Sequence, residues 1–129
     1  MLDNASDLLF GPVFDTVDIG LVVLDSRGCI VGWNEWMARV SRRPARDVLG
    51  KAFLEVFPEL RQTRLPDVID DSFLAGSSSI LTHTLNALLP LQGESGEPLL
   101  HNIVVRPVSS GRTNYCLLQI TDVTLAVMR

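Results

Sequence analysis

The stretch "IGLVVLDSRGCIVGWNEWMARV", from Ile19 to Val40, holds two apolar runs separated by a turn and followed by a helical pattern. The first run is rich in β-branched and aliphatic residues, which favours a strand. Asp25 and Gly28 take the first and last positions of "DSRG", as in a type I turn. The sequence therefore predicts a tight hairpin that ends at Trp33.

The second strand leads into a corner that carries both tryptophans of the chain. Asn34 is a good N-cap residue, and Trp36 and Val40 lie four residues apart on one face of the helix that would follow. We interpret Trp33 as the anchor of the corner and Asn34 as the helix cap. Trp36 is expected in the core, with the wall of a ligand cavity as the alternative.

Proline and glycine divide the next segment into short helices. Pro44 opens the first and Gly50 closes it, the second carries Phe53 and Phe57, and the third begins at Pro66. Three longer strands are then expected, in "SSSILTHTL" from Ser77, "PLLHNIVVRPV" and "NYCLLQITDV". This order predicts an α+β domain with a five-stranded antiparallel sheet and short helices over one face.

An apolar stripe precedes the hairpin, at the spacing of an amphipathic helix. Its members are Leu9, Phe10, Val13, Phe14 and Val17. We expect residues 1–18 to form an N-terminal amphipathic helical segment and residues 19–124 to form the domain. A monomer exposes such a stripe unless it packs on its own sheet, so the stripe predicts the interface of a homodimer.

Composition excludes several classes of function. A chain of 129 residues, 47% hydrophobic, suits one domain with a single core. The net charge is −4 and the basic residues are scattered, which argues against nucleic-acid binding. The sequence has neither a secretory signal pattern nor an apolar run of about 20 residues, so we expect a cytoplasmic protein with no membrane insertion in this segment.

Catalytic and metal motifs are absent from the sequence. It contains no G-x-S-x-G, H-E-x-x-H, P-loop or glycine-rich dinucleotide turn, and we expect no enzyme. Cys29 and Cys116 are interpreted as reduced thiols. Two histidines alone are a weak metal signal, and no metal is expected.

The run "GLVVLDSRGCIVGWNEWMARVSRRPARDVLGKAFLEVFPEL" resembles the first half of a PAS domain, with its D-x-x-G turn, W-N, G-K and F-P-E-L. The segments "LLHNIVVRPV" and "LLQITDVT" resemble its last two strands and their D-[IV]-T ending. The resemblance covers Val13 to Thr124. It is greatest to the PAS domains that precede diguanylate cyclase or histidine kinase modules in bacterial signalling proteins.

The resemblance implies a signal-sensing regulatory domain. Such a domain binds a small molecule in an internal cavity between the helices and the sheet, or dimerises, or both, and relays a conformational signal to a C-terminal effector with cyclic-dinucleotide or histidine kinase output. The alternative is a ligand-free PAS module for dimerisation and protein interaction.

The alternation of side chains along the expected fourth strand indicates which face would border the cavity. In "PLLHNIVVRPV" it groups Leu99, His101, Ile103 and Val105, and His101 would be one of few polar groups in an apolar pocket. The alternative, a core histidine satisfied by a backbone carbonyl, is favoured over ligand contact. The full set of cavity candidates is His101, Ile103, Val105, Leu99, Trp36, Phe53, Phe57, Ile69, Phe73 and His83.

The ligand itself is not identified by the sequence. Light-sensing flavin members of the family carry a reactive Cys in a helix, and residues 34–76 contain none, which excludes covalent flavin photochemistry. Haem is not favoured, because "PDVIDDSFLAG" lacks the axial His and only His83 or His101 remains. A non-covalent flavin or an organic ligand stays open.

The closing "TDVTLAVMR" bears on the relay of a signal. Asp122 or Thr124 can cap a helix that begins at about Leu125. We expect residues 125–129 to start a linker helix to an effector, with Asp122 and Thr124 as signal-relay residues. The alternative is an ordinary terminal helix that frays.

Overall fold

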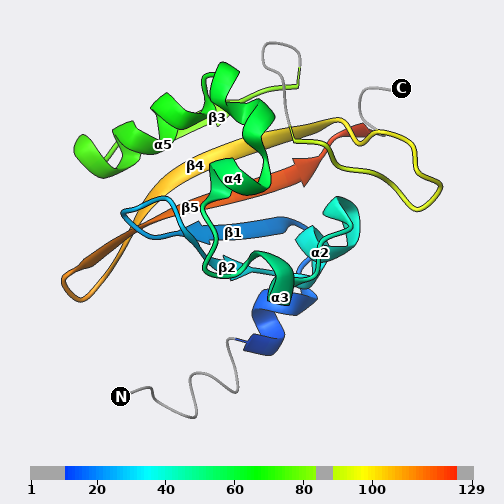
Figure 1. The fold of residues 1–129 in the computed structure, drawn as a ribbon, viewed down its shortest axis with the longest axis horizontal. Helices are drawn as coiled ribbons and strands as arrows, with labels where there is room; N and C mark the ends of the chain where they lie inside the picture. Colours follow the sequence, from blue (N-terminus) through cyan, green and yellow to red (C-terminus); the bar gives the residue numbers. More distant parts are fainter. Residues whose placement is uncertain (1–10, 84–88, 125–129) are drawn as a thin grey trace.

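The computed structural model describes residues 11–83 and 89–124. These form one five-stranded antiparallel sheet in the order β2-β1-β5-β4-β3. The strands are β1 (Gly20–Leu24), β2 (Ile30–Trp33), β3 (Ser79–Leu81), β4 (His101–Ser110) and β5 (Thr113–Asp122). Short helices accompany the sheet: α5 packs against β4 and β5, and Figure 1 shows α4 in front of β4. The predicted α+β class and five-stranded sheet are confirmed.

The helices between β2 and β3 follow the proline and glycine positions. They are α2 (Glu35–Ser41), α3 (Ala45–Val48), α4 (Phe53–Val56), the 3-10 helix η1 (Pro58–Gln62) and α5 (Leu65–Leu74). Pro44 is the N-cap residue of α3, and Pro66 lies in the first turn of α5, where a missing amide hydrogen costs nothing. Residues 11–16 are also helical and precede the sheet.

The hairpin turn between β1 and β2 is held by one aspartate. Asp25 Oδ1 accepts hydrogen bonds from the backbone amides of Arg27 and Cys29, both at 2.9 Å. The amide of Gly28 donates to the Asp25 carbonyl at 2.9 Å, and Gly28 has a φ of 81°. A side chain rarely adopts that φ, so glycine is needed there. The predicted turn is confirmed.

Asn34 joins three parts of the chain and is 0% exposed. Its Oδ1 accepts from the amides of Leu21 at 3.1 Å and Met37 at 3.2 Å. Its Nδ2 donates to the carbonyls of Phe14 at 3.0 Å and Ile19 at 2.9 Å. The predicted N-cap of α2 is confirmed, and the same side chain also fastens β1 and the first helix.

Trp33 anchors the corner through an aromatic cluster. Its Nε1 donates to the Arg43 carbonyl at 3.0 Å, and its ring stacks on Phe57 with centroids 6.1 Å apart. Phe53 meets Phe57 edge-on at 5.5 Å, and the Arg43 guanidinium lies 5.4 Å from the centre of the Phe57 ring. These contacts fix α4 against β2.

Two of the three expected long strands differ from the prediction. Of the strand expected from Ser77, the described residues 77–83 form only the three-residue β3, an edge strand on which Ile80 is 64% exposed; residues 84 and 85 lie outside the described part. The strand expected from Pro98 begins at His101. Leu99 instead donates its amide to the Leu91 carbonyl at 3.0 Å. Residues 91–99 therefore fold back on themselves before the strand begins.

Candidate functional site

The inner side of β4 is filled by core side chains. His101, Ile103 and Val105 are at most 1% exposed, as the strand alternation predicted. Leu99 lies just before the strand and packs against the same core. The face that was expected to border a ligand cavity is thus occupied by the protein's own packing.

His101 uses both ring nitrogens within the protein. The Leu89 amide donates to Nε2 at 3.1 Å, and Nδ1 lies 2.9 Å from the Leu99 carbonyl oxygen. Because a backbone N–H only donates, Nε2 carries the lone pair and Nδ1 carries the proton. His101 therefore braces residues 89 and 99 against β4, as the core-histidine interpretation expects.

The charge state of His101 agrees with these bonds. Burial lowers the pKa of His101, while the hydrogen bond to Leu99 and the negative charge of Asp122 oppose that shift. Asp122 pairs with His101 in the register of β4 and β5. The neutral ring is the form that the site favours.

A small cavity of about 180 Å³ lies beside the β1–β2 turn. Its lining includes three of the cavity candidates, Phe53, Ile69 and Phe73. Small-molecule pockets typically have about 300–1,000 Å³, so this volume suits waters or a very small ligand. Phe57 belongs to the aromatic cluster, and His83 donates its amide to Asn102 Oδ1 at 3.0 Å.

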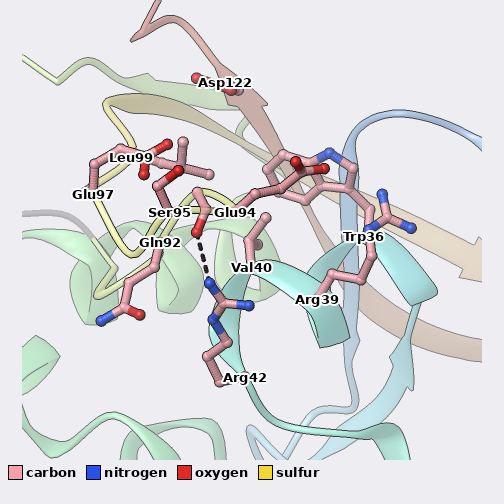
Figure 2. A pocket seen from close by; sticks show the side chains of 11 residues that line it. Trp36, Arg39, Val40, Arg42, Gln92, Glu94, Ser95, Glu97, Leu99 and Asp122 are labelled. Atoms are coloured by element: carbon pink, nitrogen blue, oxygen red, sulfur yellow. Dashed lines mark hydrogen bonds between the residues drawn. The ribbon is translucent and has the colours of Figure 1, made fainter.

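A larger cavity of about 520 Å³ forms a groove between α2 and the 92–97 loop. It is lined by Trp36, Arg39, Val40, Arg42, Gln92, Gly93, Glu94, Ser95, Glu97, Leu99 and Asp122. Figure 2 shows Arg39 and Arg42 extending from α2, Gln92, Ser95 and Glu97 on the loop side, and Asp122 on β5. Trp36 and Leu99 were cavity candidates, and Asp122 was expected only as a signal-relay residue; the other charged lining residues were not predicted.

Two hydrogen bonds join the walls of this groove. Arg42 ends α2 with a left-handed φ of 61°, and its Nη2 donates to the Gly93 carbonyl at 2.6 Å. The Gln92 amide donates to the Val40 carbonyl at 2.8 Å. The loop is thereby attached to the last turn of α2.

The end of β5 is bonded to the start of β4. The Leu100 amide donates to Thr124 Oγ1 at 3.0 Å, and the Val123 amide donates to the Leu100 carbonyl at 2.8 Å. Asp122 Oδ1 accepts from the Thr124 amide at 2.9 Å. We call the connected set the exit network: Leu89, Leu99, Leu100, His101, Asp122, Val123 and Thr124. Both expected relay residues belong to it, while residues 125–129 lie outside the described residues.

The expected dimer stripe is divided. Val13 is 50% exposed, whereas Phe14 and Val17 are half-buried. A Cβ placed on Gly32 would lie 3.4 Å from Phe14 Cζ, so this ring packs on the sheet. Leu9 and Phe10 lie outside the described residues. Among the described members of the stripe, Val13 is the most exposed.

Two classes of site receive no support in the described ranges. No helix within residues 11–83 and 89–124 is long and apolar enough to cross a membrane. In the same part of the chain, no three His, Cys, Asp or Glu side chains gather as metal ligands.

Comparison with known proteins agrees with this architecture. Residues 12–123 match the family model of the PAS fold. A sensory box sensor histidine kinase from Vibrio cholerae is 26% identical with a TM-score of 0.67, and the alignment covers 92% of this chain and 91% of that one. The chain belongs to the PAS family, because the family match spans most of its length.

Two further structures show the same fold at lower identity. The photoactive yellow protein domain from the sensor histidine kinase Ppr of Rhodospirillum centenum is 18% identical with a TM-score of 0.63, covering 94% of this chain and 100% of that one. The PAS domain of nitrogen regulation protein NR(II) from Vibrio parahaemolyticus is 13% identical with a TM-score of 0.61, covering 88% and 97%. Among curated proteins, none matches the chain.

Proposed function

We propose that this PAS domain has a sensory and regulatory role and relays a conformational change to an effector joined on its C-terminal side. The observation that carries this proposal is the exit network. It connects residues 89 and 99 with Thr124 through His101 and Leu100.

The bonds involve neighbouring residues, so we expect a change in one to affect the others. A shift of the loop that moves Leu89 or Leu99 removes a partner from His101, whose ring has no other described hydrogen bond. Leu100 lies between Leu99 and His101 and holds Thr124. A coupling of two sites requires such an element with two arrangements, and this set of bonds is our candidate.

The signal we propose is a small molecule, and the proposed output is a histidine kinase. The V. cholerae neighbour, a sensor histidine kinase, supports that output over a cyclic-dinucleotide enzyme. An internal cavity lined by the ten candidates would need His101, Ile103 and Val105 to move, because they are buried in the core. The groove beside α2 offers more volume without that movement.

A second candidate function is a ligand-free module that dimerises. The half-exposed Val13 on the first helix favours it. Exposed apolar side chains of this kind, beside a partly apolar sheet, suit a second copy of the chain. The two functions are compatible.

Hydrogen exchange followed by mass spectrometry tests the relay. Thr124→Val removes the hydroxyl that holds Leu100, and we expect faster amide exchange at Leu89 as well as at residues 99–101. Thr121→Val is the matched control, since Thr121 lies on β5 and is exposed. Faster exchange confined to residues 122–124 would refute the relay.

A further inference from the structure

We propose that the groove between α2 and the 92–97 loop is a binding site for a small zwitterion with an apolar body, of the amino-acid or short-peptide class. The site deepens the proposed function and rests on it for its consequence, but the binding is testable by itself. Its volume of about 520 Å³ is within the range of small-molecule pockets.

The groove carries charges of both signs on different elements. Arg39 and Arg42 come from α2, and the carboxylates come from Glu94, Glu97 and Asp122. Within the described part of the chain, neither arginine makes an ion pair with a carboxylate of the groove. Charges that do not neutralise one another keep their hydrogen-bonding capacity for a ligand.

The arginine side is partly positioned in advance. The bond from Arg42 Nη2 to the Gly93 carbonyl holds one guanidinium against the loop, and four of its five N–H donors are left for other acceptors. The Arg39 side chain makes no hydrogen bond with any residue in the described ranges. Together they suit a carboxylate, which arginine binds in a two-pronged geometry.

The acidic side is presented by a tight turn. The Gly93 amide donates to the Glu97 carbonyl at 2.8 Å, and the Gly96 amide donates to the Gly93 carbonyl at 3.0 Å. The Glu97 carboxylate lies over the Cα of Gly93, where a Cβ would collide with it. Because Gly93 has no side chain, the Glu97 carboxylate fits at this position, where it can accept hydrogen bonds from an ammonium group.

The lining selects among ligand classes. A dianion would face three carboxylates, and a dication would face two arginines. A molecule with one ammonium and one carboxylate satisfies both walls. Trp36, Val40 and Leu99 supply apolar contacts between them.

Occupancy of this groove would act on the exit network directly. Leu99 lines the groove, and its carbonyl is the partner of His101. Asp122 lines it as well, and its carboxylate caps Thr124. A ligand ammonium on Asp122 would compete with the Thr124 amide for that carboxylate.

Isothermal titration calorimetry of the chain with the free L-amino acids and glycyl-leucine tests the site. We expect at least one probe to bind, with its N-acetyl and its amide derivative each about tenfold weaker or more, because each lacks one charge. Arg39→Gln and Glu97→Gln should each weaken that probe by about tenfold. Arg46→Gln, exposed on α3 and outside the groove, is the control and should bind normally.

Three results would overturn the inference: no heat from any probe up to 10 mM, roughly millimolar-range affinity being the weakest that matters; equal binding of the charge-blocked derivatives; or binding unchanged in both groove variants. Melting curves check that both variants are folded. We expect wild-type melting temperatures, because the Arg39 and Glu97 side chains are exposed. The two proposals can fail separately. If no probe binds in the groove but Thr124→Val still speeds the amide exchange of Leu89, this binding site is rejected and the proposed relay is not.

Discussion

Asn34 is the residue on which the corner of the fold depends most. Asn34→Ala removes four hydrogen bonds and takes a partner from the half-buried amide of Leu21 and carbonyl of Ile19. We expect the free energy of unfolding to fall by about 2–4 kcal/mol, measured by urea denaturation. Asn114→Ala, on the exposed β4–β5 hairpin, is the matched control and should cost less than about 0.5 kcal/mol.

We expect His101 to make the stability of the domain depend on pH. Its pKa in the folded state is lowered by burial, so the folded state favours the neutral ring. This contribution is complete above the ordinary histidine pKa of about 6.5 and is lost as the pH falls through that value toward the lowered one. We expect His101→Gln, which does not titrate, to lose less stability than the wild type between about pH 7.5 and pH 5.

Urea denaturation at several pH values measures this difference. His83→Gln is the matched control, since His83 is the other histidine and contacts Asn102 instead. Equal slopes of stability against pH for His101→Gln and the wild type would show that His101 is not the group responsible.

The contact between β1 and α2 depends on a missing side chain. A Cβ on Gly20 would lie 2.7 Å from Met37 Sδ and 2.9 Å from Trp36 Cε3. We expect Gly20→Ala to push α2 away from the sheet and to cost about 1–3 kcal/mol by thermal or urea unfolding. Gly11→Ala, with nothing within 4 Å, should be neutral or slightly stabilising. If Gly20→Ala changed the free energy of unfolding no more than Gly11→Ala does, α2 would be able to move away from β1 without loss of stability.

The elements differ in how far their own residues predict them. The β1–β2 hairpin and the cap of α2 depend on Asp25, Gly28 and Asn34, whose effects act over a few residues. Among the described residues of the expected third strand, three pair with β4, so β3 is shorter there than its β-forming residues suggest. Local preference therefore predicted which elements exist better than where they end.

The candidate site was less predictable because distant residues form it. Arg42 and Gly93 are 51 positions apart, and the partner of His101 Nε2 lies in a segment without regular periodicity. Charges on a helix end and a loop usually indicate solvated surface. Of the groove residues, four carried a signal in the sequence: Trp36 and Val40 from the helix face after the corner, Leu99 from the strand alternation, and Asp122 from the D-[IV]-T ending.

The association of whole chains depends on the first helix in our account. Val13 is half-exposed there, and we expect the wild type to run as a dimer by size-exclusion chromatography with light scattering. Val13→Asp should shift it to the monomer, because a buried charge without a partner opposes association. Leu74→Asp on α5, where Leu74 is 86% exposed, should remain dimeric. A monomeric wild type would contradict the proposed dimer.

A double-mutant cycle between His101→Phe and Thr124→Val measures whether the bonds of His101 to residues 89 and 99 are energetically coupled to the bonds of Thr124 at the end of β5. Urea denaturation of the four proteins gives the coupling free energy. The exit network predicts a coupling of about 0.5 kcal/mol or more, because each substitution weakens bonds on which the other depends. A control cycle of His101→Phe with Asn114→Ala should be additive. Additivity within about 0.3 kcal/mol for His101 and Thr124 themselves would contradict the relay.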